Sequence, residues 1–241
     1  MSRRVRWGVL STANIGRRAV NPAIQASSNG ELVAVASRDP ERARAFAAEH
    51  GIPRAAASYE ALLEDPEIDA VYIPLPNALH REWTVRAARA GKHVLCEKPL
   101  ALNATECLEM HTAAAESGVV LMEAFMYRFH PRTERVVEMV RAGAVGELRV
   151  IRSAFTFRLG RRDDIRLDRR LGGGALMDVG CYCVNVSRTV AGAEPVAVQA
   201  SARWTAGYMG GGAETSVDDE LTGVLHFPGG VTAHFDCALT M

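Results

Sequence analysis

Lys98, Asp178 and Tyr182 have side chains that could together move a proton. Asp178 and Tyr182 are four positions apart in a stretch with helical spacing, so both side chains would lie on one face of a helix. A phenol with a pKa of about 10 is a poor base at neutral pH, and a nearby ammonium lowers that pKa by favouring the phenolate. The three side chains together indicate acid–base chemistry in a shared cleft. Taken singly, each is more typical of a structural role: Tyr182 of a packed aromatic, Asp178 of a helix-surface charge and Lys98 of a solvated lysine.

Lysine is rare in this chain, which contains only Lys92 and Lys98 beside many arginines. A retained lysine suggests a task that arginine does not perform, such as titrating or presenting a compact ammonium. Lys98 comes just after the apolar run His93–Cys96, which we expect to be the fifth strand of a parallel sheet. The carboxyl ends of such strands border the ligand crevice of doubly wound folds. The run Gly172–Gly174 would let the backbone approach that crevice closely.

The turn after the first apolar run, Val5–Leu10, has the features of a weak nucleotide-binding motif. In the pattern G-x-G-x-x-G only the third glycine, Gly16, is present, and the other two positions hold Ser11 and Ala13. Both replacements are small, so backbone N–H groups can still approach a pyrophosphate at the start of the following helix. A plain strand–turn–helix is the alternative. The predicted cofactor residues of this turn are Ser11, Thr12, Ala13, Asn14, Ile15 and Gly16.

The second predicted strand ends at Ser37, where an enzyme that uses NAD usually carries an acidic residue for the ribose 2′-hydroxyl. Ser37 and Arg38 stand there instead. A hydroxyl and a guanidinium suit a 2′-phosphate, which a carboxylate would repel. We therefore predict NADP as the cofactor, with NAD still possible because Asp39 lies one position further on.

The order of apolar runs and helical stretches predicts two domains. Over residues 1–124 short continuous apolar strands alternate with helices, which is typical of an α/β Rossmann domain with a doubly wound parallel sheet. Over residues 125–241 most strands come in succession, with a helical stretch before them. This order indicates an α+β domain in which a helix covers one face of a mainly antiparallel sheet, for substrate binding and oligomerisation. A strand-like run stops close to Met241 with nothing to cover it, so we expect this second domain to be incomplete.

The composition excludes several classes of protein. The 241 residues include 28 basic and 28 acidic side chains, so no net charge attracts nucleic acid or an anionic membrane. No apolar run approaches the ~20 residues of a membrane helix, and the basic N-terminus lacks a signal-peptide core, so we expect a cytoplasmic protein. Five cysteines without a CxxC pair predict neither a disulfide framework nor a metal site. The Cys181-Tyr182-Cys183 pair is too tight and isolated for zinc.

Several segments resemble one known family. The segment "GKHVLCEKPLALN" (Gly91–Asn103) resembles the Gfo/Idh/MocA oxidoreductases, the family of glucose–fructose oxidoreductase and inositol dehydrogenase. The resemblance extends over the whole chain, through the segments "WGVLSTANIG", "VASRDPERA", "PLPNALH", "EAFMYRFHP" and "RLDRRLGGGALMDVGCYCVN". It implies an NAD(P)-dependent dehydrogenase or reductase that acts on CH–OH groups.

The resemblance also implies roles for the acid–base residues. The family's active-site pattern D-x-G-x-H begins here at Asp178, but Tyr182 stands where histidine is usual. This departure is similar to the branch that holds glucose–fructose oxidoreductase, dimeric dihydrodiol dehydrogenases and NADP-dependent xylose dehydrogenases. It implies Tyr182 as the proton-transfer group, Lys98 as its electrostatic partner and Asp178 as the residue that positions a neighbouring hydroxyl. The implied substrate is an aldose such as xylose or glucose, or a related polyol or dihydrodiol.

The resemblance suggests further residues with less specific roles. Those expected beside the cofactor are Pro74, Asn77, His80, Glu97 and Lys98, and those expected beside the substrate are Arg128, His130, Arg166 and Asp168. His80 is an equally good candidate for capping the helix that follows it, and Arg128 and His130 for pairing with carboxylates. The resemblance also implies a cis Lys98–Pro99 bond and a homo-oligomer formed through the sheet of the second domain.

Two other functions stay open from the sequence. The fold family includes non-enzymatic NAD(P)-binding sensors and transcriptional co-regulators, but these need not keep Lys98, Asp178 and Tyr182 together. An incomplete second domain would also leave the same residues in an inactive fragment.

Overall fold

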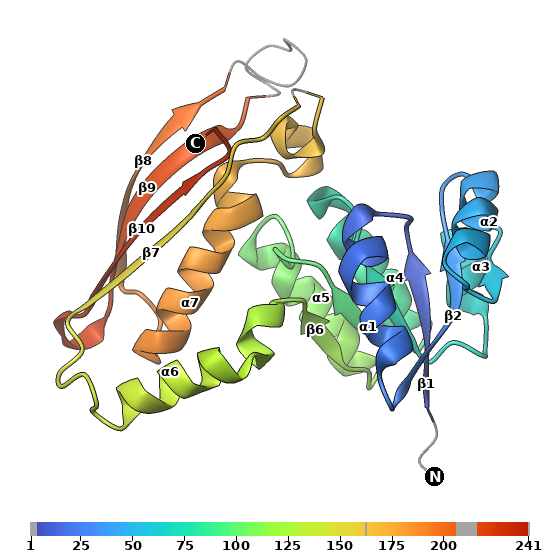
Figure 1. The fold of residues 1–241 in the computed structure, drawn as a ribbon, viewed down its shortest axis with the longest axis horizontal. Helices are drawn as coiled ribbons and strands as arrows, with labels where there is room; N and C mark the ends of the chain where they lie inside the picture. Colours follow the sequence, from blue (N-terminus) through green and yellow to red (C-terminus); the bar gives the residue numbers. More distant parts are fainter. Residues whose placement is uncertain (1–3, 162, 206–215, 241) are drawn as a thin grey trace. The chain divides into compact units, whose positions relative to one another are not determined.

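The computed structural model describes residues 4–161, 163–205 and 216–240, and it divides into two compact units, Met1–Ala124 and Phe125–Met241. Each unit has its own sheet and its own apolar core (Figure 1). The predicted combination of a doubly wound α/β fold and a mainly antiparallel α+β fold is confirmed.

The first unit is built on a parallel sheet with the strand order β3-β2-β1-β4-β5-β6. Its strands are β1 (Val5–Leu10), β2 (Gly30–Ala36), β3 (Arg54–Ala55), β4 (Ala70–Ile73), β5 (His93–Cys96) and β6 (Leu121–Glu123). The order reverses between β1 and β4, which is the point where open α/β sheets bind nucleotides. The turns after β1, β2, β4 and β5 all leave the sheet at the same, carboxyl edge.

Helices cover both faces of this sheet (Figure 1). One face carries η1 (Gly16–Val20), α1 (Asn21–Ala26) and α2 (Pro40–Glu49), and the other carries α3 (Tyr59–Glu64), α4 (His80–Arg89) and α5 (Ala104–Glu116), with the short η2 (Asn77–Leu79) before α4. Because both faces are covered, the middle of the sheet is apolar, and all four residues of β4 are buried.

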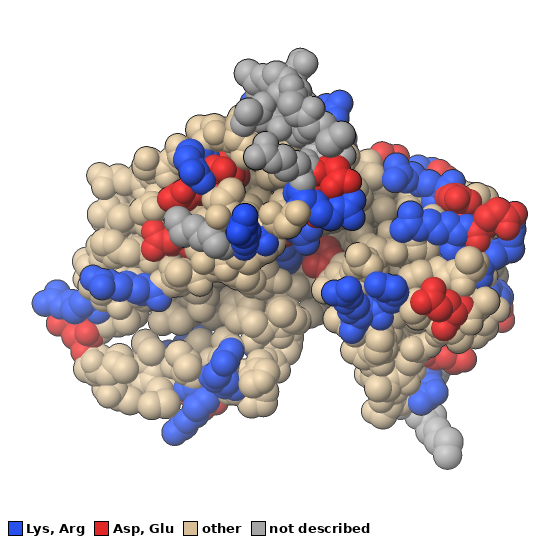
Figure 2. Space-filling model, turned by 45° about the horizontal axis from the view of Figure 1, so that its top comes forward, with Lys and Arg blue, Asp and Glu red and all other residues tan. Residues whose placement is uncertain are grey.

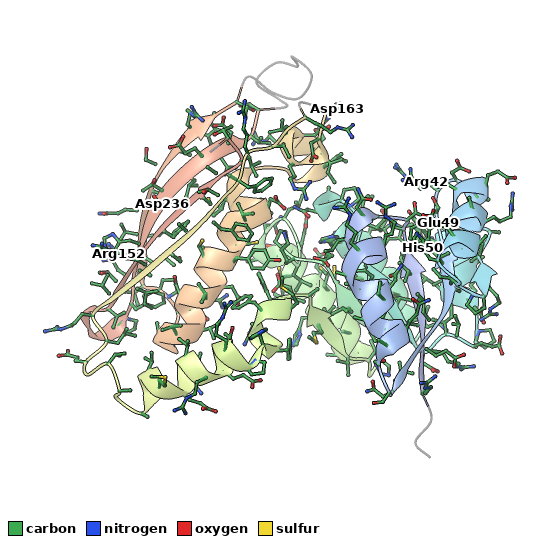
Figure 3. The ribbon with its side chains drawn as sticks, in the orientation of Figure 1. Arg42, Glu49, His50, Arg152, Asp163 and Asp236 are labelled. Atoms are coloured by element: carbon green, nitrogen blue, oxygen red, sulfur yellow. The ribbon has the colours of Figure 1, made fainter. Side chains whose placement is uncertain are left out.

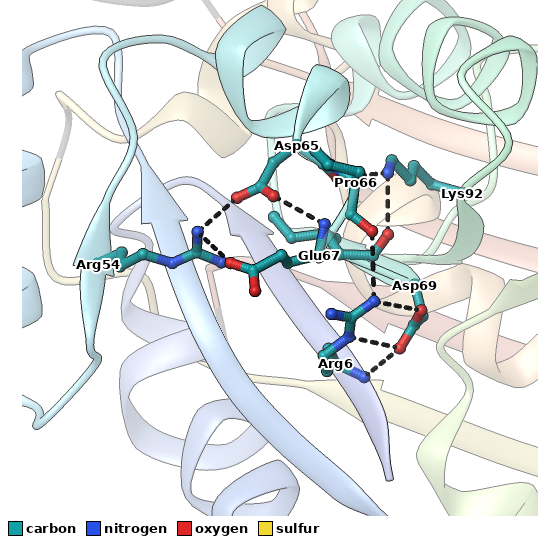
Figure 4. Close-up of polar contacts among 8 residues, drawn as sticks. Arg6, Arg54, Asp65, Pro66, Glu67, Asp69 and Lys92 are labelled. Atoms are coloured by element: carbon teal, nitrogen blue, oxygen red, sulfur yellow. Dashed lines mark hydrogen bonds and ion pairs between the residues drawn. The ribbon is translucent and has the colours of Figure 1, made fainter. Parts of the chain in front are cut away.

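Lys92, the other lysine of the chain, lies at the amino edge of the sheet (Figure 4). The buried Nζ of Lys92 donates to the carbonyl oxygens of Asp65 (2.6 Å) and Ile68 (2.9 Å). The backbone and side chain of Arg6, in β1, donate to the carboxylate of Asp69, just before β4, over 2.9 to 3.2 Å. Burial lowers the pKa of Lys92. This lysine therefore fastens the α3–β4 connection and lies away from the carboxyl edge.

In the second unit one long helical segment, residues 176–191, packs against a four-stranded sheet. The sheet has the order β7-β10-β9-β8, and only its β7–β10 pair is parallel. Its strands are β7 (Val150–Thr156), β8 (Ala197–Trp204), β9 (Asp218–His226) and β10 (Thr232–Ala238). Its helices are η3 (Met126–Phe129), α6 (Pro131–Arg141), η4 (Ile165–Leu167), η5 (Arg169–Leu171), η6 (Leu176–Gly180), α7 (Cys181–Ala191) and η9 (Pro228–Gly230).

Close packing of the helical segment on the sheet depends on Gly180. A Cβ atom there would come 2.7 Å from Sγ of Cys237 in β10. Burial raises the pKa of the Cys237 thiol to about 12, so this cysteine is a packing residue.

The sheet of the second unit has an exposed strand at one edge. The side chains of Val198 and Trp204, in β8, are 63% and 62% exposed. Association through this sheet stays a prediction.

The surface agrees with the balanced composition. On the face drawn in Figure 2, Lys and Arg side chains are interspersed with Asp and Glu side chains. Among the described residues, no helix is both long enough and apolar enough to span a bilayer. The cytoplasmic location stays a prediction.

Candidate functional site

The predicted nucleotide turn joins β1 to a helical segment that starts at Asn14. Ser11 has a φ of 148°, a backbone conformation that residues other than glycine rarely adopt. The first helical hydrogen bond runs from the N–H of Arg17 to the carbonyl of Ala13. The N–H groups of the turn before it are the ones a helix start offers to a phosphate. A Cβ atom on the buried Gly16 would lie 3.5 Å from Cε1 of Tyr72, in β4. The backbone therefore passes close over the Tyr72 ring.

The end of β2 bears on the choice between the two dinucleotides. The carboxylate of Asp39 accepts the N–H groups of Glu41 (3.0 Å) and Arg42 (3.3 Å), so it caps the start of α2. Ser37 is buried, and its hydroxyl accepts the N–H of Asp39. Arg38 is exposed at the strand end, and Arg42 follows on α2 (Figure 3). The residues at this position therefore fit a ribose that carries a 2′-phosphate.

The segment after β4 carries three residues of the cofactor prediction: Pro74, Asn77 at the start of η2 and His80 at the start of α4. His80 is fully buried, and its ring nitrogens lie 2.8 Å from two backbone carbonyl oxygens, Nδ1 from Pro99 and Nε2 from Leu75. Burial lowers the pKa of this imidazole, and the two carbonyls oppose that effect. The ring makes no capping bond to α4, which disagrees with the capping alternative. The imidazole instead joins the loop after β4 to the loop after β5.

The loop after β5 carries Lys98, and side chains of three other elements hold it. The Lys98–Pro99 peptide bond is cis. The hydroxyl of Tyr72 donates to Oε1 of Glu97 over 2.6 Å, and the carboxylate of Glu123 accepts the N–H of Leu100 over 2.8 Å. With the His80 ring on Pro99, the turn is fastened from β4, α4 and β6.

The helical segment of the second unit carries Asp178 and Tyr182. Asp178 lies in the π-helical η6, and Tyr182 lies in the first turn of α7. The Nε of Arg166 donates to Oδ2 of Asp178 over 2.7 Å, and its Nη1 donates to Asp164 over 3.1 Å. Although burial opposes it, the carboxylates of Asp178 and Asp164 raise the pKa of Arg166. Asp178 is therefore a fixed carboxylate within a short charge network.

The ring of Tyr182 lies among three aromatic rings that the prediction did not include. Its centroid is 5.2 Å from that of Phe125, 6.0 Å from that of Tyr127 and 5.4 Å from that of Phe155. The hydroxyl of Tyr127 also donates to Oδ1 of Asn185 over 2.5 Å. The segment "EAFMYRFHP" contained Phe125 and Tyr127, but nothing in the sequence showed that they pack on Tyr182.

The start of the helical segment of residues 176–191 is anchored to β9. The carboxylate of Asp218 accepts the N–H of Leu176 over 2.6 Å. Gly174 has a φ of 123°, and a Cβ atom there would collide with Oδ1 of Asp218. Burial raises the pKa of Asp218. The sequence offered no signal for this carboxylate, because it lies 42 positions beyond the backbone group that it caps.

The remaining predicted substrate residues have contacts of their own. Nδ1 of His130 accepts the N–H of Arg132 and caps α6, and Arg128 is exposed in η3. The buried carboxylate of Asp168 pairs with Arg170 over 2.7 Å. Contact of these side chains with a substrate stays a prediction. Lys98 belongs to the first unit and Tyr182 to the second, so their meeting in one cleft also stays a prediction.

Two family models match the chain. "Oxidoreductase family, NAD-binding Rossmann fold" of the Gfo/Idh/MocA proteins matches residues 5–125, and the "GFO/IDH/MocA C-terminal domain" matches residues 133–241. These matches confirm the resemblance and the predicted dinucleotide-binding fold.

Curated relatives agree with these matches. The chain is 49% identical over 231 residues to "D-xylose 1-dehydrogenase (NADP(+)) 2" of Haloferax volcanii, covering 95% of this chain and 68% of that protein. It is 38% identical over 239 residues to "Trans-1,2-dihydrobenzene-1,2-diol dehydrogenase" of Macaca fascicularis, covering 98% of this chain and 69% of that one. The chain thus spans about two thirds of the length of these relatives.

Solved structures share the fold over almost the whole chain. The aldose-aldose oxidoreductase of Caulobacter crescentus matches with a TM-score of 0.90 and 34% identity, over 99% of this chain and 72% of that one. A 3-ketoreductase of Actinomadura kijaniata, solved with NADP and TDP-benzene, matches with a TM-score of 0.88 and 36% identity, over 99% and 71%. On these matches in both units, the chain belongs to the Gfo/Idh/MocA family of oxidoreductases.

Proposed function

We propose that the chain carries the cofactor and substrate parts of an NADP-dependent oxidoreductase that transfers a hydride between a nicotinamide and a sugar, or a related polyol or diol. One observation carries the proposal: Lys98 follows β5 at the same edge of the sheet as the nucleotide turn after β1. Doubly wound sheets bind dinucleotides at that edge, where the strand order reverses. The ammonium is therefore on the side where the cofactor's reactive ring is expected.

The end of β2 supports NADP over NAD. Asp39 is engaged in capping α2, and the exposed guanidinium of Arg38 is available to a 2′-phosphate. The NADP named for the xylose dehydrogenase and for the solved 3-ketoreductase agrees with this choice.

The substrate class follows the relatives, whose names include a xylose dehydrogenase and an aldose-aldose oxidoreductase. The nicotinamide, when bound, supplies the hydride acceptor or donor. Tyr182 takes the proton of the sugar hydroxyl during oxidation, and Lys98 stabilises the phenolate that results. Asp178, held by Arg166, orients a neighbouring hydroxyl of the sugar.

The spacing of the two acid–base residues also supports these roles. The solved 3-ketoreductase has been studied with one lysine and one tyrosine substituted, and those positions are 84 apart. Lys98 and Tyr182 are also 84 positions apart.

The test is a set of activity assays that pairs NADP or NAD with D-xylose, D-glucose or a dihydrodiol. Activity is measured by the absorbance of the reduced nicotinamide. We expect turnover with NADP and an aldose. Lys98→Met and Tyr182→Phe should each lower kcat by at least about a hundredfold, because general acid–base help is lost, while both variants still bind NADP. Near-normal turnover of either variant would remove that residue from the mechanism. Binding of NADP without turnover of any substrate would favour a sensor.

A further inference from the structure

Tyr72 is a buried polar side chain at the centre of the parallel sheet. It lies in β4, its exposed fraction is 0%, and its hydroxyl donates to Oε1 of Glu97 over 2.6 Å. A buried hydroxyl without a hydrogen bond is costly, and a bond from a hydroxyl to a carboxylate is among the stronger ones. The pair therefore links the interior of β4 to the residue that precedes Lys98.

The ring of Tyr72 also lies beneath the nucleotide turn. It packs in one apolar cluster with Val9 and Val35, and a Cβ atom on Gly16 would lie 3.5 Å from its Cε1. One side chain thus lies next to both parts of the cofactor side: its ring lies beneath Gly16, where an added Cβ atom would touch it, and its hydroxyl bonds Glu97 in the turn after β5.

Glu97 connects Tyr72 to the backbone of Lys98. Its Oε1 accepts from Tyr72, while its Oε2 lies 3.3 Å from the backbone N–H of Lys98. The next two residues are held separately, Pro99 by the His80 ring and Leu100 by the carboxylate of Glu123. Of these three side-chain contacts, the one from Tyr72 acts nearest to Lys98 in the sequence.

We propose that Tyr72 is a positioning residue, which orients the carboxylate of Glu97 and thereby fixes the backbone from which Lys98 projects. The role in turnover rests on the proposed function, in which the Lys98 ammonium must stand beside the reacting oxygen. Loss of the Tyr72 hydroxyl removes the bond to Oε1 of Glu97, so the Glu97 carboxylate is held less firmly beside the Lys98 backbone. The ring, and with it the contact beneath Gly16, does not depend on the hydroxyl.

The test is Tyr72→Phe, which removes one oxygen atom and keeps the ring. We expect kcat to fall by about ten- to a hundredfold, since small displacements of a catalytic group cost that much. The dissociation constant of NADP, followed by titration, should stay within about twofold, because this variant removes no contact beneath the nucleotide turn. Without cofactor, hydrogen exchange should become faster at the amides of Lys98 and Leu100.

Two further variants test whether the effects of Tyr72→Phe come from the lost bond to Glu97 and not from a general loss of stability. Tyr59→Phe removes another buried phenol hydroxyl of the same unit, on α3, where the ring packs edge-on against Trp83. Because the Tyr59 hydroxyl bonds the backbone of Arg38, NADP binding can respond to this variant. The control is therefore exchange in the Lys98 turn, and kcat at saturating NADP, both of which should stay unchanged. In a Glu97→Ala background, Tyr72→Phe should have almost no additional effect on kcat, because the carboxylate through which it acts is gone.

The outcomes separate this inference from the proposed function. Unchanged kcat and unchanged exchange in Tyr72→Phe would overturn it, as would full additivity with Glu97→Ala. If the unmodified chain turns over no substrate, the proposed function fails. The exchange rates of the Lys98 turn, compared between Tyr72→Phe and Tyr59→Phe, then decide by themselves whether Tyr72 holds that turn.

Discussion

The guanidinium of Arg166 holds the carboxylate of Asp178 through a 2.7 Å bond from Nε to Oδ2, while the same side chain also binds Asp164. Arg166 lies in η4, outside the helical segment that carries Asp178. The carboxyl proposed to orient a sugar hydroxyl is therefore itself oriented by a neighbouring loop.

Arg166→Gln should impair turnover more than folding. The Arg166 side chain is 41% exposed, so loss of its charge should lower the free energy of unfolding by less than about 1 kcal/mol. The rotation that Asp178 gains should lower kcat/KM for the sugar about tenfold or more. Steady-state kinetics and urea unfolding measure the two effects. Arg161→Gln, which breaks an exposed pair with Asp163, is the matched control and should change neither. Unchanged kcat/KM in Arg166→Gln would contradict the role of the pair.

Arg38→Ala should weaken NADP without weakening NAD. A charge-assisted contact to a 2′-phosphate contributes about 1.5–3 kcal/mol, so the dissociation constant of NADP should rise roughly ten- to a hundredfold. Titration with both dinucleotides measures the difference. Arg44→Ala, which removes an exposed arginine of α2 paired with Glu41, should leave both constants unchanged. An equal loss for NAD and NADP would show that Arg38 does not read the phosphate.

Gly174→Ala should destabilise the second unit much more than Gly192→Ala. Both glycines have positive φ, but the space around a Cβ atom on Gly192, at the end of α7, is open. That substitution should cost about 1–2 kcal/mol from the backbone alone. At Gly174 the methyl group also collides with Asp218, so the cost should reach about 3 kcal/mol or more. Urea unfolding gives both values, and similar costs would show that Asp218 moves aside freely.

Stability should depend on pH through Asp218. Burial raises its pKa above the ordinary value of 3.8, so its favourable contribution is complete below that value and is lost as the pH rises through the raised pKa. Relative to Asp218→Asn, which does not titrate, the unmodified chain should lose unfolding free energy as the pH rises above the ordinary pKa of 3.8 and through the raised pKa. Urea unfolding across this range measures the difference, and a constant difference would disprove the linkage.

Much of the fold could be predicted because the strands of a covered parallel sheet are apolar on both faces. The run His93–Cys96 has the same bounds in the sequence prediction and in β5. The short elements β3, with two residues, and α3, with six, escaped prediction because neither is long enough to show a periodic pattern. The π-helical turns at Gly16–Val20 and Leu176–Gly180 escaped it as well, since each is a single turn of five residues, too short to show a period of its own.

The candidate site was predictable only where a residue's place depends on its own strand or helix. Lys98 follows a recognisable strand, so its edge of the sheet was evident. The contact between Tyr72 and Glu97 depends on β4 and β5 pairing in register, and the contact between Asp218 and Leu176 depends on packing across the second unit. Contacts of this kind arise from tertiary packing and leave no local pattern.

The capping bonds of Asp39 also restrict how the dinucleotide preference can be changed. Reversal toward the unphosphorylated coenzyme requires an acid that faces the adenosine ribose, and the nearest carboxylate already closes the first turn of α2. Turning it outward would unravel that turn, at a loss of about 1 kcal/mol. A redesign must therefore introduce a new acid at position 37 or 38 and leave position 39 as it is.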